Sequence, residues 1–266
     1  MTKISRDTVI WITGASSGIG EAITNKVVAK GAKVIISARR KEELERVKNA
    51  SMYPENISIL RLDLADADAL PLKAKEAESI HGKIDVLINN GGISQRDKAI
   101  NTSLEVDRRL MEINYFGTIA LSKALTPKMI ELGKGHHVVI TSAVGIISTP
   151  LRSSYAASKH ALHGFYDAFR AEHHSDGLKV TIALPGFIRT NISINALTGN
   201  GSQQGTMDHA QANGMTADEC ASQIIKAVEK ESEEIYIGGL KEVAGIYLKR
   251  FLPGLFSRIV RKMAVT

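Results

Sequence analysis

Short runs of apolar and β-branched residues alternate along the chain with longer segments whose apolar positions recur at helical spacing. Glycine, proline or polar residues bound the short runs, which is typical of buried strands. Strict alternation of strand and helix predicts one parallel, doubly wound α/β sheet with helices on both faces. We expect about seven strands, at residues 8–13, 33–38, 57–62, 84–88, 137–142, 178–184 and 234–237.

The helical segments carry their own end signals. A capping box, in which a Ser or Thr is followed three residues later by Glu or Gln, begins at Thr102 and again at Thr216. Pro253 interrupts the last apolar pattern, so two short helices are expected there instead of one. The expected helices before it cover residues 21–30, 41–49, 66–81, 102–131, about 152–174 and 216–230.

Residues able to contact a ligand directly follow the expected strands. In a parallel doubly wound sheet, ligands bind beyond the carboxyl ends of the strands, and these ends meet at one edge. We therefore expect a single site built from separate stretches of the chain. The residues at the strand ends are Gly14, Arg39, Asp63, Asn89, Ser142 and Pro185.

The first of these stretches is the glycine-rich loop Gly14-Ala-Ser-Ser-Gly18-Ile-Gly20, between the first strand and the first helix. Glycines let backbone N–H groups and a helix N-terminus approach a phosphate closely, because no Cβ stands in the way. A plain strand-to-helix turn is the alternative. The position after the first strand favours the phosphate site of a dinucleotide.

The second strand ends in Ser37-Ala-Arg39-Arg40. Dinucleotide folds that prefer NAD usually place an acidic residue here, whereas two guanidinium groups suit the 2′-phosphate of NADP. Alternatively, both arginines merely begin the charged helix 41–49. We favour Arg39 as the phosphate ligand and expect NADP(H) to be preferred over NAD(H).

Two further strand ends fit the same site. Asp63 could accept a hydrogen bond from an adenine amino group, or cap the next turn. Asn89-Asn90-Gly91-Gly92 suits close approach to a ligand, although an ordinary loop would also use these residues.

Tyr155-Ala-Ala-Ser-Lys159 places a phenol and an ammonium one helical turn apart on one face. A nearby ammonium stabilises the phenolate and lowers the pKa of the tyrosine. Such a phenol can exchange a proton with an alcohol oxygen. Taken alone, the pair is more often a surface contact, but its place after the strand that ends at Ser142 makes it the candidate for the chemistry.

Together, in this order and spacing, the motifs resemble those of the short-chain dehydrogenase/reductase family over nearly the whole chain. The resemblance implies a Rossmann-type fold. Segments 89–96 and 141–165 are similar to the family's member-seven group, which resembles hydroxysteroid and retinoid reductases; Gly91 stands where the family more often has alanine. The motifs are Thr13-Gly14-x-x-x-Gly18-x-Gly20, Asn89-Asn90-Gly91-Gly92, Asn114, Ser142, Tyr155-x-x-x-Lys159, Pro185-Gly186 and Thr190.

The resemblance implies catalytic roles for four residues. Tyr155 would be the general acid in carbonyl reduction, and Lys159 would lower its pKa and hold the nicotinamide ribose. Ser142 would bind the carbonyl oxygen, and Asn114 would hold a water that relays protons to Lys159.

Dinucleotide contacts are implied in the same way. The glycine loop would line the pyrophosphate, Asp63 the adenine and Asn90 the adenosine ribose, and Thr190 would contact the carboxamide. A basic residue common in the family's glycine loop is replaced here by Ser16-Ser17. The implied contacts are Gly14, Ser16, Ser17, Gly18, Ile19, Arg39, Arg40, Asp63, Leu64, Asn90, Gly91, Tyr155, Lys159, Pro185, Gly186, Ile188 and Thr190.

Residues 187–215 are polar, glycine-rich and longer than an ordinary loop. We expect a mobile lid over the substrate, with surface disorder as the alternative. Apolar residues beside the expected site favour a hydrophobic ketone, aldehyde or secondary alcohol as substrate. The candidate wall residues are Ile93, Val144, Ile146, Ile147, Leu151, Phe187, Ile188 and Ile192.

The net charge of +6 is concentrated in a C-terminal tail, residues 241–266, which has six basic side chains and one acidic one. It therefore does not indicate nucleic-acid binding by residues 1–240, the expected dehydrogenase domain. Apolar residues recur in the tail at helical spacing, with Arg and Lys between them. This fits a helix lying in a membrane surface, or equally one packed on its own domain or on a partner subunit.

Composition sets the remaining expectations. With 44% hydrophobic and 23% charged residues among 266, the chain is an ordinary globular protein, and no apolar run is long enough to span a membrane. Residues 1–7 show neither a signal peptide nor the N-terminal anchor of the member-seven group, and the single cysteine fits a reducing cytoplasm. Among the eight histidines, His160, His163, His173 and His174 have no acidic or cysteine partner to complete a ligand set, so we expect them to be solvated helix residues and expect no metal.

The favoured function is hydride transfer between NADP(H) and an apolar carbonyl compound or secondary alcohol, by a homodimer or homotetramer. One alternative is a catalytically idle dinucleotide sensor or scaffold, against which the intact set of Asn114, Ser142, Tyr155 and Lys159 argues. The other is a membrane-surface protein of lipid metabolism, in which the tail would contact the membrane peripherally.

Overall fold

In the computed structural model, which describes residues 2–262, seven parallel strands form one sheet. The strand order β3-β2-β1-β4-β5-β6-β9 means that the chain starts in the middle, builds one edge and then builds the other. Every neighbouring pair is parallel, which confirms the predicted doubly wound, Rossmann-type α/β fold. The strands are β1 (Val9–Thr13), β2 (Lys33–Ser37), β3 (Ile57–Ile59), β4 (Val86–Asn89), β5 (Gly135–Ile140), β6 (Leu178–Pro185) and β9 (Glu234–Ile237).

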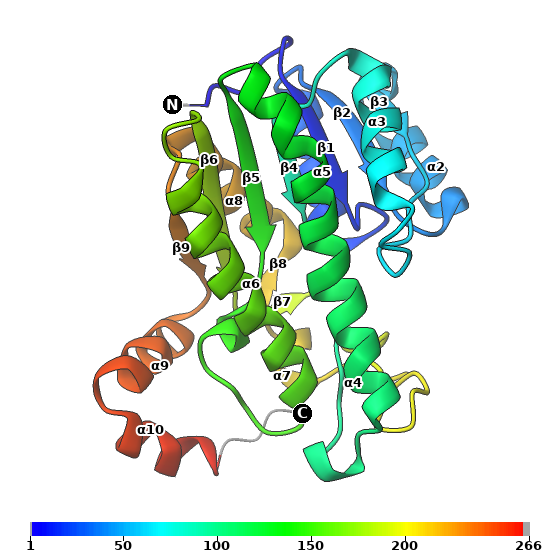
Figure 1. Ribbon diagram of the computed structural model, residues 1–266. Coiled ribbons are helices and arrows are strands. Elements are labelled where there is room, and N and C mark those ends of the chain that lie inside the picture. The colour runs from blue at the N-terminus through cyan, green and yellow to red at the C-terminus, as the bar shows by residue number, and fades with distance from the viewer. Residues whose placement is uncertain (1, 263–266) are drawn as a thin grey trace.

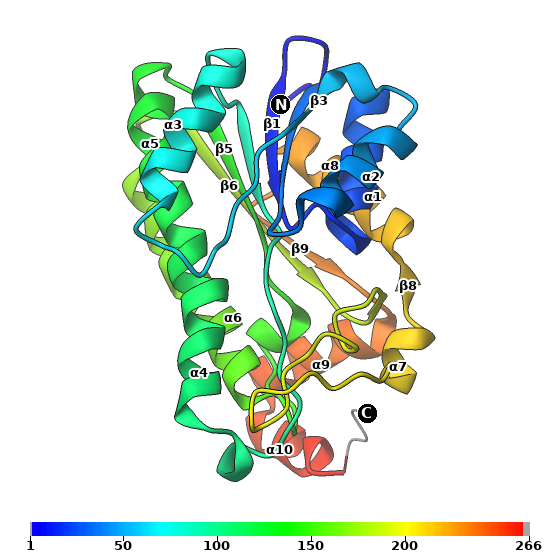
Figure 2. The same cartoon turned by 90° about the vertical axis from the view of Figure 1, so that its right-hand side faces the viewer.

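Helices cover both faces of this sheet, as Figures 1 and 2 show. Alternate residues of a strand point to opposite faces, so Ile10 and Ile12 of β1 enter one core while Val9 and Trp11 enter the other. Both cores exclude water, which explains why the strands are almost continuously apolar. The helices over one face are α1 (Gly18–Ala29), α2 (Lys41–Ala50) and α8 (Ala217–Lys230), and those over the other are α3 (Leu70–His81), α5 (Gly117–Glu131) and α6 (Ser153–Glu172).

The long helix expected over residues 102–131 is divided. Helix α4 (Leu104–Met111) and α5 are separated by a π-helical turn, Glu112–Phe116. A π turn inserts one extra residue and is often found at functional sites. Nothing in the local sequence pattern signals it.

The two predicted capping boxes had different outcomes. The side chain of Ser103, not Thr102, caps α4 by accepting a hydrogen bond from the Val106 N–H, so the first prediction was wrong. At the start of α8, the Thr216 and Glu219 side chains bond each other's backbone N–H, as predicted.

The segment 187–215 contains a short parallel ribbon of β7 (Ile188–Arg189) and β8 (Met215–Thr216), together with one turn of helix, α7 (His209–Ala212). These elements were not predicted. Pro253 divides the tail as expected into α9 (Leu240–Phe251) and α10 (Pro253–Val260). Within residues 2–262, no helix is both long and apolar enough to cross a bilayer.

Candidate active site

The glycine loop packs directly against the loop that follows β4. A Cβ on Gly14, whose φ is +64°, would lie 2.7 Å from the Cα of Gly91. The Nδ2 atom of Asn90 donates to the carbonyl oxygens of Thr13 at 3.1 Å and Gly14 at 3.0 Å. Asn90 therefore holds the shape of the loop, a structural role that its motif did not reveal.

We expect Gly20→Ala to weaken dinucleotide binding. The added Cβ would lie 2.4 Å from the Gly14 carbonyl oxygen, so the loop would have to shift. Overpacking of this kind costs about 1–3 kcal/mol, equivalent to a roughly 5- to 150-fold rise in the dinucleotide Kd measured by fluorescence titration. Gly164→Ala is the matched control, because a Cβ there meets nothing within 4 Å. Equal Kd values for the two variants would contradict the role of the loop.

A groove of about 500 Å³ runs along this edge of the sheet. The Asp63 side chain caps the next turn by accepting from the Ala65 N–H at 3.0 Å, which confirms that alternative. Asp63 also lines the groove, and its contact with an adenine stays a prediction. Arg109 of α4 lines the groove too and was not expected there. The expected contacts that line the groove are Gly14, Ser16, Ser17, Gly18, Ile19, Arg39, Arg40, Asp63, Leu64, Asn90, Gly91 and Thr190.

A second cavity, of about 650 Å³, adjoins the groove. Ile19, Asn90 and Thr190 line both hollows, so a ligand could extend from one into the other. The walls of the second cavity are mostly apolar. The expected site residues that line this second cavity are Ile19, Asn90, Ser142, Tyr155, Lys159, Pro185, Gly186, Ile188 and Thr190.

Ser142, Tyr155 and Lys159 come together at this cavity. Tyr155 is 9% exposed and forms a hydrogen bond with Ser142, which follows β5 by two residues. The Lys159 ammonium lies 5.8 Å from the centroid of the Tyr155 ring and donates to the Ile140 carbonyl at 2.9 Å. Because Tyr155 and Lys159 lie one turn apart on α6, the helix itself sets their spacing.

Asn114 lies behind these residues, in the π-helical turn, and is fully buried. Its side chain accepts from the Ile93 N–H at 2.8 Å and donates to the Ile93 carbonyl at 2.9 Å. A Cβ on Gly92 would lie 3.0 Å from Asn114 Oδ1 and 3.7 Å from Lys159 Nζ, so both groups border Gly92. Asn114 lines neither hollow, and its water relay stays a prediction.

Burial controls the acid–base properties of the pair. It lowers the pKa of Lys159 to about 8. Burial also raises the pKa of Tyr155, so the net lowering expected from Lys159 is not found in this structure. The charge of Arg96 and the hydrogen bond with Ser142 lower this pKa only in part. The charge of Arg152 lowers the pKa of Tyr155 as well. Arg96 and Arg152 therefore stabilise the phenolate, and neither was predicted from the sequence to do so.

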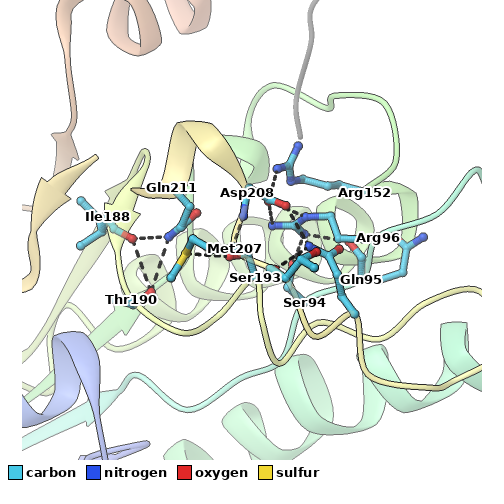
Figure 3. A network of polar contacts seen from close by, with 12 residues as sticks. Ser94, Gln95, Arg96, Arg152, Ile188, Thr190, Ser193, Met207, Asp208 and Gln211 are labelled. Carbon is cyan, nitrogen blue, oxygen red and sulfur yellow. Dashed lines mark hydrogen bonds and ion pairs between the residues drawn. The ribbon is translucent and has the colours of Figure 1, made fainter. Parts of the chain in front are cut away.

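Figure 3 shows the buried network to which these arginines belong. Arg96 donates to Asp208 Oδ2 from two nitrogens, both at 2.8 Å, and Arg152 donates to the same oxygen at 2.9 Å. Gln204 donates to Asp208 Oδ1 at 2.9 Å. Burial raises the pKa of the Asp208 carboxyl, but the hydrogen bond from Gln204 and the two guanidinium groups together hold it below its ordinary value.

The network also fixes the lid segment 187–215. Asp208 belongs to the lid, Arg96 to the loop after β4, and Arg152 immediately precedes α6. Backbone hydrogen bonds reinforce the contact, because the Arg96 N–H donates to the Leu197 carbonyl at 2.8 Å. The lid is therefore docked in this structure, and its mobility stays a prediction.

The substrate wall was only partly foreseen. Ile93 lines the first groove instead of the second cavity, while Ile146 and Leu151 line neither hollow. Ile146 packs into the core, and Leu151 adopts a φ of +64° at the turn just before Arg152. The candidate wall residues that do line the second cavity are Val144, Ile147, Phe187, Ile188 and Ile192, and their contact with a substrate stays a prediction.

The tail supplies wall residues that the sequence did not assign to the site. Leu248, Phe256 and Ile259 line the cavity, and Phe256 packs with Ile246 of α9 against Ala143. Three alternatives were open for the tail, and packing on its own domain is confirmed for the side of α9 and α10 that faces the cavity. The amphipathic pattern gave no indication of which part of the domain the helices would contact.

The histidines divide into exposed and buried positions. His163 is buried and bonded to Thr141 Oγ1 at 3.1 Å, so the prediction that it is solvated was wrong. His160 bonds the Ala156 carbonyl within its own helix at 2.8 Å. Across residues 2–262, no three His, Cys, Asp or Glu side chains converge as a metal site would need.

A family profile described as short chain dehydrogenase matches residues 8–200. The chain is a member of the short-chain dehydrogenase family. Its similarity to the member-seven group is also confirmed. A "Dehydrogenase/reductase SDR family protein 7-like" protein of Anopheles gambiae is 42% identical over 262 residues, covering 96% of this chain and 83% of its own. "Dehydrogenase/reductase SDR family member 7B" of Bos taurus is 41% identical and covers 99% of this chain and 83% of its own.

Solved structures agree with this assignment. A short-chain dehydrogenase from Streptomyces avermitilis superimposes with a TM-score of 0.81 and 31% identity, covering 96% of each chain. An alcohol dehydrogenase from the archaeon Thermococcus sibiricus, complexed with 5-hydroxy-NADP, gives a TM-score of 0.74. It covers 88% of this chain and 97% of its own, and at 24% identity it shows a shared fold alone. This short-chain dehydrogenase is therefore an oxidoreductase of a family that binds a nicotinamide dinucleotide.

Proposed function

We propose that this short-chain dehydrogenase uses NADP(H) to interconvert an apolar ketone or aldehyde and the corresponding alcohol. The observation that carries the proposal is the convergence of Ser142, Tyr155 and Lys159 on the wall of a mostly apolar cavity. That cavity adjoins a groove shaped by glycines. A cavity of about 650 Å³ with few polar groups suits a hydrophobic substrate.

The groove residues fit a dinucleotide. Gly14 and Gly20 leave space that a Cβ would fill, and the start of α1 at Gly18 directs backbone N–H groups toward the groove. We propose that Arg39 and Arg40 hold the 2′-phosphate, and that Lys159 and Thr190 hold the nicotinamide half. The bound cofactor would supply the hydride.

The protein's part in the reaction is to bind, orient and protonate. As a carbonyl is reduced, negative charge develops on its oxygen, and hydrogen bonds from Tyr155 and Ser142 would stabilise that charge. Tyr155 would then give its proton to this oxygen. Lys159 and the two nearby arginines would favour the resulting phenolate, and Asn114 would support reprotonation through water. In alcohol oxidation the phenolate would act as the base.

The direct test is NADPH consumption, followed by absorbance, with a panel of aromatic and lipid-like ketones. We expect turnover to increase with the apolar size of the ketone up to the cavity volume. The proposal would be overturned if the protein bound NADPH but reduced no apolar ketone, and bound NADP⁺ but oxidised none of the matching alcohols. That result would favour a catalytically idle dinucleotide sensor instead.

Arg39→Asp should reverse the cofactor preference. It removes a charge-assisted hydrogen bond to the 2′-phosphate, worth about 1.5–3 kcal/mol, so the KM for NADPH should rise roughly 10- to 150-fold while the KM for NADH changes little. Steady-state kinetics with both cofactors measures this. Arg108→Asp, an exposed change of equal charge outside the groove, is the control. A wild-type preference for NADH would contradict the assignment.

We also propose that the enzyme is a cytoplasmic homodimer or homotetramer. Phe116, Ile130 and Leu132, in and beside α5, are exposed apolar side chains that a partner subunit could cover. Cys220 is buried, and burial raises its pKa to about 12, as expected of a packing residue in a reducing compartment.

A further inference from the structure

Exposed apolar side chains are concentrated on α9 and α10. Fourteen large apolar side chains are exposed across the described residues, and five of them fall within the thirteen residues 247–259. Scattered exposed apolar residues are normal, whereas a cluster marks an interaction surface. The cluster, here named the tail patch, consists of Tyr247, Phe251, Leu252, Leu255 and Ile259.

The surroundings of the tail patch are basic. Residues 243–262 contain five Lys or Arg residues and no acidic residue. Lys249 is turned inward and donates to the Ile146 carbonyl. The other four cations are exposed, and these are Arg250, Arg258, Arg261 and Lys262. Apolar side chains between cations form a surface that matches the interface of an anionic bilayer.

The tail patch reaches the mouth of the substrate cavity. Ile259 is 44% exposed and also lines the cavity, and Leu248 and Phe256 of the same two helices line it from within. Figures 1 and 2 show α9 and α10 together at the end of the molecule, beyond the carboxyl edge of the sheet. A surface that covers the tail patch would therefore lie against the cavity entrance.

We propose that the tail patch docks on the surface of an anionic lipid bilayer, with the entrance of the apolar cavity facing the lipid. The apolar side chains enter the interface, and each exposed cation strengthens binding by about five-fold. The delivery of substrate from lipid rests on the proposed function, whereas the docking itself does not.

A second copy of the chain fits this surface less well. In a symmetric dimer the same patch is used twice, so two sets of four exposed cations would be brought together. Like charges facing each other across an interface oppose association. An anionic lipid surface instead neutralises them.

Vesicle flotation of the full chain tests the docking, with vesicles of phosphatidylcholine alone or mixed with phosphatidylserine. We expect flotation with the anionic vesicles, and its loss at high salt. Arg258→Gln combined with Arg261→Gln should weaken binding about 25-fold, because two cations are removed. Flotation that is equal on neutral and anionic vesicles, or absent from both, would overturn the proposal.

The apolar contribution needs a matched pair of variants. Phe251→Glu combined with Leu255→Glu should abolish flotation, whereas Met52→Glu combined with Leu72→Glu, at positions 86% and 62% exposed elsewhere, should not. Circular dichroism and NADPH binding show that each variant is folded. Light scattering tests for a second copy of the chain, the competing occupant of the tail patch. If Phe251→Glu combined with Leu255→Glu converted a dimer into monomers, the patch would be a dimer interface and lipid docking would be overturned. Flotation needs neither cofactor nor substrate. A protein that does not float can therefore still catalyse the proposed reaction, and a protein that does not reduce ketones can still bind vesicles.

Discussion

Tyr155→Phe is expected to slow NADPH-dependent ketone reduction by about 10²- to 10⁴-fold, the usual contribution of a positioned general acid. Phenylalanine keeps the ring, which packs against Val106 and Leu110, so the fold and NADPH binding should be preserved. Only the hydroxyl that bonds Ser142 and faces the cavity is removed. Single-turnover absorbance with saturating NADPH isolates this chemical step from binding.

Tyr166→Phe is the matched control for this experiment. Tyr166 belongs to the same helix and is fully buried, but its hydroxyl bonds Ser122 at 2.6 Å and Asn89 at 3.3 Å, away from both hollows. We expect it to lose about 1 kcal/mol of unfolding free energy and to keep wild-type turnover. A Tyr155→Phe enzyme that consumes NADPH as fast as the Tyr166→Phe enzyme would remove Tyr155 from the mechanism.

Asp208→Ala is expected to lower the free energy of unfolding by about 3–5 kcal/mol, because it removes the buried carboxylate that pairs with both Arg96 and Arg152. The side chains of Asp208, Arg96 and Arg152 are only 1%, 6% and 4% exposed. Two guanidinium groups that share one carboxylate oxygen would then repel each other. Urea denaturation measures the global loss, and hydrogen exchange over residues 193–215 measures the release of the lid.

The control for Asp208 is an ion pair of the same length at the surface. Asp218 lies 2.8 Å from Lys26 but is 72% exposed, so water screens the pair. Asp218→Ala should cost less than about 1 kcal/mol. If the two alanine variants had equal unfolding free energies and equal protection from hydrogen exchange over residues 193–215, the network in Figure 3 would not be what holds the lid.

The network could not be predicted from the sequence because its members are far apart in the chain. Asp208 is 112 residues from Arg96 and 56 from Arg152. Each residue alone is an ordinary charged side chain in a polar loop. What makes them unusual is burial, and burial depends on how the lid folds back over the start of α6.

Hydrophobic periodicity, by contrast, is a local property, and it sufficed for the sheet. The apolar runs predicted all seven strands, because strands buried on both faces must be apolar throughout, and their alternation with helices predicted that the sheet is parallel. Spacing within one helix likewise predicted that Tyr155 and Lys159 share a face. The π-helical turn around Asn114 escaped prediction, as did the hydrogen bond that the Asn114 side chain accepts from Ile93, which lies 21 residues away in the chain.

The sequence by itself determined the fold, the family and the chemical types at the strand ends, because these follow from residue order and spacing. Tertiary structure alone decided three further features. It buried Tyr155 enough to raise its pKa, placed Arg96 and Arg152 beside it, and folded the tail over the cavity. Burial, long-range charge and the choice of packing surface depend on distances in space, which no local pattern in the chain records.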